Sequence, residues 1–140
     1  MLVQQISVFI ENKPGQALKP IVALADAGID LCAISIADTK DFGILRIITR
    51  DNEKAIKILK EIGCTTTQND LIGVVVEDTP GGLAAVLQVF KEEDINIEYL
   101  YSYLPRQNQQ AIMFFKVEQT QTAKKKLDKH RLKLVSLQDI

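Results

Sequence analysis

The chain contains few of the residues that build metal centres. Its 140 residues include only two cysteines and one histidine. Cys32 and Cys64 form no Cys-x-x-Cys pair and have no histidine beside them, so we expect no metal site. Both thiols are interpreted as buried apolar side chains, a pattern that suits a reducing compartment.

Sequence motifs of catalysis and of cofactor binding are also missing. The chain has no Gly-x-Ser-x-Gly, P-loop, His-Glu-x-x-His or Gly-x-Gly-x-x-Gly pattern. The single histidine, His130, falls at the end of a predicted helix with no nucleophile matched to it, so a structural role is favoured. These absences predict a protein that is not an enzyme and binds no cofactor.

The charge balance and the hydropathy exclude further classes. With 17 basic and 18 acidic residues the net charge is -1, which gives no general attraction for nucleic acid or anionic membrane. No apolar run reaches the length of a membrane helix, and the N-terminus has a strand pattern instead of an export signal. We therefore expect a cytoplasmic location and no nucleic-acid or membrane partner. The local basic cluster is interpreted as the solvated face of a helix and of the strand after it: Lys124, Lys125, Lys126, Lys129, Arg131 and Lys133.

What the chain does contain is an internal repeat. Pro14-Gly15 recurs 66 residues later as Pro80-Gly81, and the same shift aligns Ile29-Asp30-Leu31 with Ile95-Asn96-Ile97. Later in each half the shift becomes 68, because two residues are added within the polar stretch Leu104–Gln110. Insertions are tolerated in surface loops, which supports this alignment. The repeat predicts two modules, residues 1–69 and 70–140.

Each half has the same predicted order, β-α-β-β-α-β. Strands are indicated by alternating apolar residues, and helices by apolar residues at helical spacing. The first half has strands at Val3–Ile10, Asp30–Ala37, Gly43–Thr49 and Cys64–Gln68, and helices at Ala17–Ala25 and Asn52–Ile62, the latter capped by Asn52. The second half has strands at Leu71–Glu77, Asn96–Leu104, Gln110–Val117 and Leu132–Leu137, and helices at Gly81–Glu93 and Gln121–His130.

This order predicts an α+β fold of the ferredoxin-like type in two tandem copies. Right-handed crossovers place both helices of a copy on one face of a four-stranded antiparallel sheet. The other face and the sheet edges need cover, so we expect a homodimer.

The segment after the first strand of each half is the candidate binding element. It runs from Glu11 to Gly15 and again from Glu77 to Gly81. Proline suits the first turn of a helix, and glycine lets a ligand approach the backbone. Free N–H groups at a helix start attract a carboxylate, and Asn12 or Asp78 can point to the same place. The alternative is that these are ordinary capping residues.

Tyr99, Tyr101 and Tyr103 alternate along one predicted strand and therefore share one sheet face. They can form an aromatic ligand wall, or they can cover the sheet by packing or subunit contact. We favour packing or subunit contact.

The stretch Ile10–Leu18 together with Gly28–Leu31 resembles the ACT domain, a regulatory module that binds amino acids. Asp78–Ala84 together with Ile95–Ile97 resembles it in the second half, so the resemblance covers nearly the whole chain. It implies the βαββαβ fold, modules that pair side by side, and a free amino acid bound between the paired modules.

The resemblance also implies site residues. In serine-sensing members the loop has the pattern His-x-Asn-x-Pro-Gly; here Ile10 and Val76 stand at the histidine position, which departs from the serine pattern. A further family asparagine, at the start of the second strand, matches Asp30 and Asn96. The predicted ligand-binding residues are Asn12, Lys13, Pro14, Gly15, Gln16, Asp30, Leu31, Asp78, Thr79, Pro80, Gly81, Asn96 and Ile97.

The family builds a site from the loop of one module and the second strand of its neighbour. If the two halves are neighbours, Asn12 joins Asn96, while Asp78 joins Asp30. Two amides can hold an amino acid, whereas two acids repel its carboxylate, so one good and one weak site are expected. If identical halves pair across a dimer, Asn12 joins Asp30 instead.

The sequence therefore predicts an amino-acid sensor that regulates a partner enzyme of amino-acid metabolism. The alternative is a structural or protein-interaction module that binds no ligand.

Overall fold

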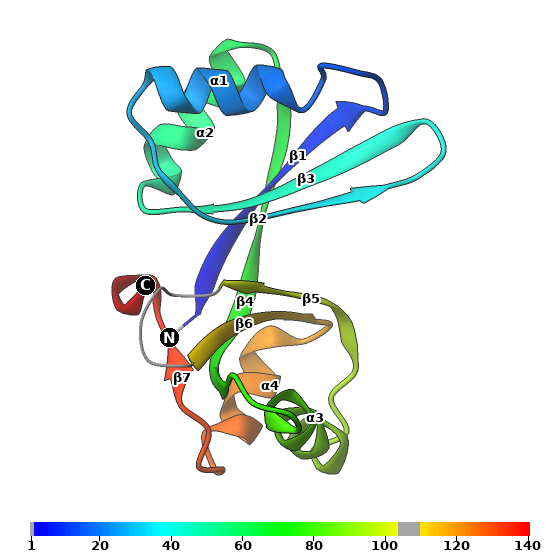
Figure 1. The fold of residues 1–140 in the computed structure, drawn as a ribbon, viewed down its shortest axis with the longest axis vertical. Helices are drawn as coiled ribbons and strands as arrows, with labels where there is room; N and C mark the ends of the chain where they lie inside the picture. Colours follow the sequence, from blue (N-terminus) through cyan, green and yellow to red (C-terminus); the bar gives the residue numbers. More distant parts are fainter. Residues whose placement is uncertain (1, 104–109) are drawn as a thin grey trace. The chain divides into compact units, whose positions relative to one another are not determined.

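The fold is described by a computed structural model for residues 2–103 and 110–140. The chain divides into two compact units, which we call the first module, Gln4–Asn69, and the second module, Met1–Val3 together with Asp70–Ile140 (Figure 1). Residues 104–109 of the predicted polar loop lie outside the described residues.

The first module contains β1 (Val3–Glu11), α1 (Leu18–Asp26), β2 (Leu31–Asp38), β3 (Phe42–Thr49), α2 (Asn52–Glu61) and the start of β4 (Thr65–Glu77). Its strand order is β2-β3-β1-β4, and both β1 and β2 pair antiparallel with β3. Alternate residues of β1 and β3 pack with one side of α1 and α2. The buried core of this module consists of Ile6, Val8, Leu24, Ile29, Leu45, Ile47, Ala55 and Leu59.

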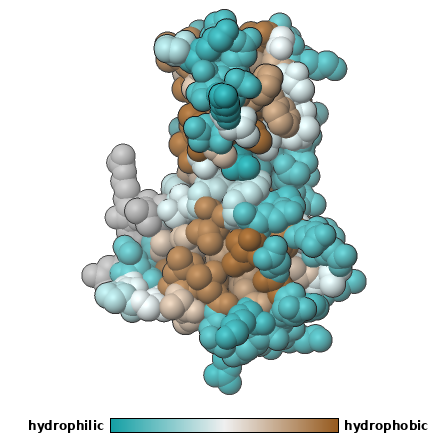
Figure 2. Space-filling model, turned by 90° about the vertical axis from the view of Figure 1, so that its right-hand side faces the viewer, coloured by the Kyte–Doolittle hydropathy of each residue, from teal (hydrophilic) through white to brown (hydrophobic). Residues whose placement is uncertain are grey.

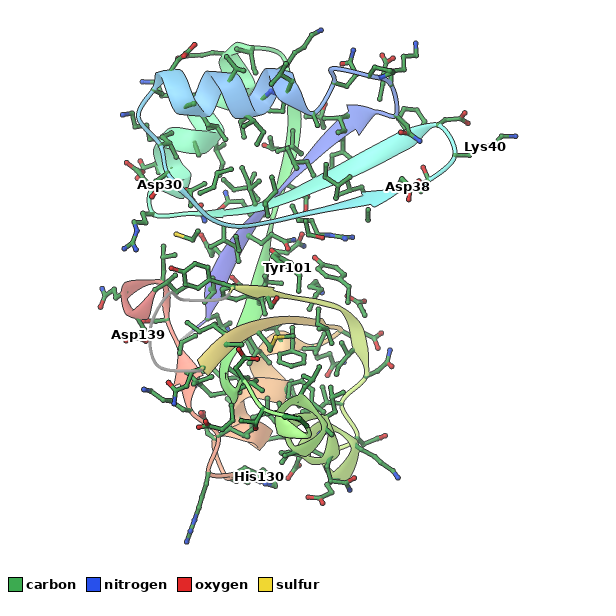
Figure 3. The ribbon with its side chains drawn as sticks, in the orientation of Figure 1. Asp30, Asp38, Lys40, Tyr101, His130 and Asp139 are labelled. Carbon is green, nitrogen blue, oxygen red and sulfur yellow. The ribbon has the colours of Figure 1, made fainter. Side chains whose placement is uncertain are left out.

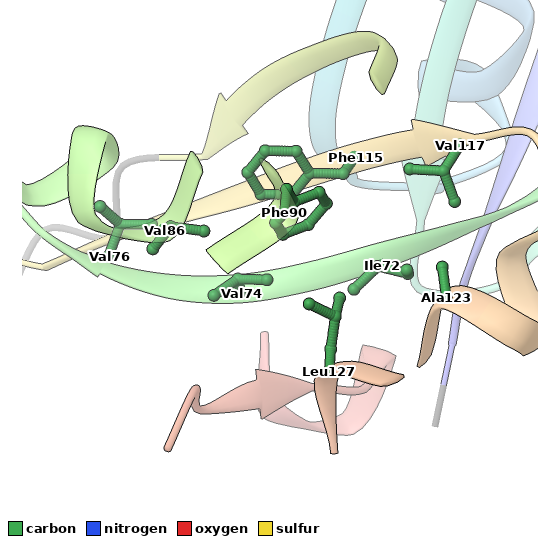
Figure 4. Packing of buried hydrophobic residues seen from close by; sticks show 9 residues of the cluster. All are labelled: Ile72, Val74, Val76, Val86, Phe90, Phe115, Val117, Ala123 and Leu127. Atoms are coloured by element: carbon green, nitrogen blue, oxygen red, sulfur yellow. The ribbon is translucent and has the colours of Figure 1, made fainter. Parts of the chain in front are cut away.

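The second module contains the rest of β4, α3 (Gly82–Glu92), β5 (Ile97–Tyr103), β6 (Gln110–Val117), α4 (Thr120–Leu127), β7 (Leu134–Val135) and a short 3-10 helix (Leu137–Asp139). Its strand order is β7-β4-β6-β5, with antiparallel pairing throughout. Figure 4 shows the core between sheet and helices, where the rings of Phe90 and Phe115 lie 4.6 Å apart between centroids.

Each module thus has the predicted ferredoxin-like α+β order, and its two helices cover one face of its sheet (Figure 1). The alternation of apolar residues accounts for this. Ile6 and Val8 of β1 turn toward the helices, and the intervening residue Ser7 turns to the opposite face.

One expected break is absent. The strands predicted at Cys64–Gln68 and Leu71–Glu77 are a single strand, β4, which runs from Thr65 to Glu77. No glycine or proline lies between Thr65 and Leu71 to turn the backbone, so the last strand of the first module continues as the first strand of the second.

The end of the chain also differs from expectation. α4 ends at Leu127 instead of His130, and β7 is limited to Leu134–Val135. The apolar spacing of the helix stops at Leu127, after which a turn forms with His130 N–H donating to the Leu127 carbonyl at 3.0 Å. The unexpected 3-10 helix is held by a reciprocal capping box between Ser136 and Asp139.

The cap of α2 is Asp51, not Asn52 as predicted. The Lys54 N–H donates to Asp51 Oδ1 at 3.1 Å. Asn52 instead accepts a 2.7 Å hydrogen bond from Thr49 Oγ1 and donates to the Gln4 carbonyl at 3.0 Å. Its amide therefore ties three segments of the first module together.

Across residues 2–103 and 110–140, no helix has the length and apolar character needed to cross a bilayer.

Candidate functional site

Both Pro–Gly loops are open to solvent. Residues 12–15 and 78–81 are exposed. Gly15 and Gly81 have left-handed φ angles of 82° and 88°, and among the described residues no heavy atom lies within 4 Å of the place where a Cβ would be. A ligand can therefore reach the backbone of either loop without displacing protein side chains.

The prolines do not lie in the first turn of a helix, which corrects the sequence-based expectation. α1 begins at Leu18, well after Pro14, and α3 begins at Gly82, directly after the cap residue Gly81. The reason is the glycine after each proline. Its left-handed backbone cannot be part of a right-handed helix, so the helix starts only beyond it.

The two loops differ in the contacts that hold them. In the first loop, Asn12 N–H donates to the Asp41 carbonyl at 3.1 Å, and its Nδ2 donates to the Thr39 carbonyl at 3.4 Å. Asn12 is thereby fixed against the turn between β2 and β3. In the second loop, Gly82 packs so closely that a Cβ there would lie 2.0 Å from the Glu77 carbonyl oxygen. The second loop is consequently the tighter one.

Within one module, the loop and the start of the second strand lie apart. β1 and β2 both run antiparallel to β3, so they point in the same direction. Glu11 pairs with Phe42 at one end of β3, and Leu31 pairs with Thr49 at the other. Figure 3 shows Asp30 at the start of β2, at the opposite end of that strand from Asp38. The structure therefore does not bring Asn12 and Asp30 of one module together.

The second module has the same arrangement. Glu77 pairs with Gln110 at one end of β6, and Ile97 pairs with Val117 at the other. Asp78 and Asn96 of one module are therefore also separated. A site that combines a loop with a second-strand position needs two modules.

The second-strand positions themselves divide into exposed and packed residues. Asp30 and Asn96 are exposed, whereas Leu31 and Ile97 pack against the cores of their modules. Asn96 borders two depressions of the second module. One has a volume of about 220 Å³ and the other about 440 Å³.

The first module has a groove of about 690 Å³ beside its Pro–Gly loop, and Gln16 is one of its lining residues. Its apolar wall includes Leu18 and Val22 of α1, which are 62% and 44% exposed, and Ile62 after α2. Sequence reasoning missed this groove. The apolar stripe of α1 is wider than its contact with the sheet, and helical spacing alone does not say which part stays uncovered.

The cysteines are less enclosed than predicted. Cys32 and Cys64 are both free and half-buried, and Cys64 is one of the residues that line the groove just described. Burial raises the pKa of both thiols above the ordinary value, so each is protonated at neutral pH. Among the described residues, no group of three or more His, Cys, Asp or Glu residues could hold a metal ion.

The tyrosines of β5 share one face, as their alternation predicts. Their partners on β6 are Lys116, Phe114 and Ile112, which are alternate residues and so also share one face. The ring of Tyr101 lies 6.4 Å from that of Tyr99 and 5.8 Å from the buried ring of Phe114. These contacts favour the packing interpretation.

His130 has a structural contact. Its Nε2 lies 2.7 Å from Glu93 Oε1, and this hydrogen bond lowers the pKa of Glu93 below its usual value. Two lysines of the basic cluster also contact their own module: Lys124 pairs with Asp128 at 2.8 Å, and Lys126 donates to the Glu93 carbonyl at 3.1 Å.

Two ferredoxin-like modules in tandem, each with an open Pro–Gly loop before its first helix, define a class of small paired α+β modules. The chain belongs to the ACT domain pair family, whose model matches residues 1–140. No protein of curated function matches the chain.

Solved structures have the same architecture. Protein BT0572 from Bacteroides thetaiotaomicron is 33% identical, with a TM-score of 0.89 over 96% of this chain and 92% of that one. The regulatory subunit of aspartate kinase from Thermus flavus is 21% identical, with a TM-score of 0.63 over 91% of this chain and 90% of that one. The corresponding subunit from Thermus thermophilus, in its ligand-free form, has the same identity and TM-score. These two subunits support the fold alone.

Proposed function

We propose that this ACT domain pair binds a free amino acid and regulates a partner enzyme of amino-acid metabolism, with no catalysis or cofactor of its own. The observation that carries the proposal is the pair of uncovered loops, in which Gly15 and Gly81 present their backbone to solvent. Membership of the ACT domain pair family supports it, as does the fold shared with regulatory subunits of aspartate kinase.

The chemistry of the loops suits the carboxylate of an amino acid. Exposed backbone amides near a helix start can donate hydrogen bonds to it. Asn12 is held in place by its hydrogen bond to the Thr39 carbonyl, and its Oδ1 can still accept from an ammonium group. The rest of the site comes from a neighbouring module, because Asp30 and Asn96 lie at the far end of their own sheets.

The four polar positions make the sites unequal. Asn12 combined with Asn96 offers two neutral amides, which suit a zwitterion. Asp78 combined with Asp30 offers two acids, which repel a carboxylate. We therefore expect one strong and one weak site if neighbouring halves of the chain form them.

A homodimer supplies further neighbours. β2 lies at an end of the strand order, and its Ile34 and Ile36 are 49% and 56% exposed. They pair with Ile47 and Leu45 of the core, so they lie on the helix-covered face of the sheet but remain exposed there. A face of the second module is also apolar (Figure 2). An uncovered apolar edge strand favours pairing with a second copy.

A ligand that binds one arrangement of modules more tightly than another raises the population of that arrangement. The partner enzyme would respond to this change in population.

A thermal-shift screen of the common amino acids tests the proposal, since a ligand that binds only the folded state raises the melting temperature. Calorimetric titration of Asn12→Ala and Asp78→Ala should then give a large loss of affinity for the first variant and a small loss for the second. Lys57→Ala, an exposed change on α2, serves as the control and should bind as the wild type does. Equal losses in the two loop variants would contradict the unequal-site model.

The second candidate is a protein-interaction module without a ligand. The exposed apolar groove around Leu18 and Val22 favours it. If no amino acid stabilises the wild-type protein, sensing is excluded and this candidate is preferred.

A further inference from the structure

We propose that the second module holds an additional site for a small α-amino acid, in the depression between α4 and the segment that joins α3 to β5. The depression has a volume of about 220 Å³, and its polar wall includes Asp94, Asn96, Thr122 and Lys126. This site goes beyond the proposed function, because all of its residues belong to one module and neither Pro–Gly loop takes part; Asn96 is the one residue that it shares with the proposed loop site.

Asp94 is the first observation behind this site. Among the residues that the structure describes, it is the one non-glycine residue with a left-handed backbone, at φ 55°. Gly28 occupies the same place after α1, with φ 73°. The capping hydrogen bond, from Asp94 N–H to the Lys91 carbonyl at 3.1 Å, would form equally well with glycine. Aspartate adopts a left-handed backbone more readily than most residues, so this position places a carboxylate beside the depression where the first module has a glycine.

A comparison of the two modules explains why the depression is open. In the first module, Lys54 Nζ donates to the Ala27 carbonyl at 3.0 Å. In the second module, the equivalent carbonyl of Glu93 accepts from Lys126 at 3.1 Å. Lys54 aligns with Thr122, whereas Lys126 lies one helical turn later. The short side chain of Thr122 therefore leaves free the space that a lysine at this position would cross.

The charges match a zwitterion. The ammonium of Lys126 has three N–H donors, of which the Glu93 carbonyl uses one, so it can also bind a carboxylate. The carboxylate of Asp94 can bind an α-ammonium, and the Asn96 amide can donate or accept. The lining also includes the buried residues Val117 and Ala123 and, beside them, Ile95, Glu118 and Gln119.

Size and charge narrow the ligand. Drug-sized molecules occupy pockets of roughly 300–1,000 Å³, so this smaller depression suits a compact molecule. Its lining carries two carboxylates, on Asp94 and Glu118, against the one ammonium of Lys126. An acidic side chain would be repelled here. The site therefore takes an α-amino acid with a neutral or basic side chain.

Two substitutions copied from the first module test the site. Thr122→Lys introduces the lysine found at position 54, and Asp94→Gly introduces the glycine found at position 28. Asp94→Gly should weaken binding of a neutral or basic amino acid by roughly tenfold or more, the effect of losing one charge-assisted hydrogen bond. Thr122→Lys should weaken it at least as much, because the long side chain fills the space that the ligand would occupy. Asp94→Gly should also raise the melting temperature by relieving the left-handed strain, so its lost binding cannot come from unfolding. Lys54→Thr, in the first module, is the matched control and should leave this affinity unchanged.

Titration calorimetry and amide NMR spectra provide the readouts. The ligand should shift the amide signals of Asp94 and Thr122 in the wild type and in Asn12→Ala, but not in Thr122→Lys; the Asn96 amide is left out because the proposed loop site uses it too. Unchanged binding in both Thr122→Lys and Asp94→Gly would overturn the proposal, as would the absence of shifts at these amides. If Asn12→Ala alone abolishes binding, the loop site stands and this one is wrong.

Discussion

His130 Nε2 lies 2.7 Å from Glu93 Oε1, which joins the turn after α4 to the residue that ends α3. The hydrogen bond from His130 lowers the pKa of Glu93, and the charges of His130, Lys129 and Lys126 act in the same direction. A carboxyl group whose pKa is lower in the folded state stabilises that state at any pH above its unfolded pKa. The contribution is lost as the pH falls through the folded value.

Glu93→Gln should therefore lower the melting temperature at neutral pH. The difference in melting temperature between Glu93→Gln and the wild type should narrow once the pH drops below about 4, where the glutamates of the unfolded chain become protonated. Thermal unfolding between about pH 2 and pH 7 measures this. Glu61→Gln, an exposed change at the end of α2, is the control. A gap that stays constant across the acid range would contradict the linkage.

Gly82→Ala should destabilise the second module. The added Cβ would lie 2.0 Å from the backbone oxygen of Glu77, and a main-chain atom at the end of β4 cannot move aside cheaply. We expect a loss of about 2–3 kcal/mol in the free energy of unfolding, the upper part of the range for overpacking. In Gly15→Ala the added Cβ would have no heavy atom of the described residues within 4 Å, so only the left-handed backbone is strained. The loss in the free energy of unfolding should be about 1 kcal/mol. Denaturant unfolding should rank the two in this order, and the reverse order would refute the argument.

Asp51→Ala should remove the side-chain cap of α2 and cost about 1 kcal/mol of stability. The Lys54 N–H, which now donates to Asp51 Oδ1, would be left to water. Glu53→Ala, in the first turn of the same helix, should have a smaller effect. Chemical denaturation of both variants measures the difference, and equal losses would mean that Asp51 acts only through its charge.

Ile36→Lys should dissociate the proposed homodimer, because it places a charge on the exposed apolar edge of β2. Ile62→Lys is the matched control, since Ile62 is 47% exposed against 56% for Ile36 but lies at the end of α2. Light scattering after size-exclusion chromatography should show a smaller particle for the first variant only. If the wild type is a monomer, or if Ile36→Lys stays dimeric, β2 is not the dimer edge.

Much of the fold followed from local pattern. The recurrence of Pro14-Gly15 as Pro80-Gly81 and the alternation of apolar residues in strands such as β1 predict two βαββαβ modules, because strand and helix spacing are short-range properties. The cap of α2 was assigned wrongly, because Asp51 and Asn52 are both good capping residues. A long-range hydrogen bond from Asn52 to Gln4, together with a local one from Thr49, decides between them.

The candidate site was predictable only in part. Its loops could be found from proline and glycine, whose backbone preferences are intrinsic. The depression at Asp94 could not, because Thr122 and Lys126 come from a different helix, and their positions relative to Asp94 depend on how α4 packs in the second module.

The sequence by itself determined the duplication, the ferredoxin-like order and the glycine turns, since each depends on residues that are neighbours in the chain. Only the tertiary structure decided that Leu18 and Val22 stay uncovered, and that the Pro–Gly loop and the start of the second strand lie at opposite ends of the sheet in each module. These features depend on strand register and helix packing between distant residues, which spacing along the chain does not encode.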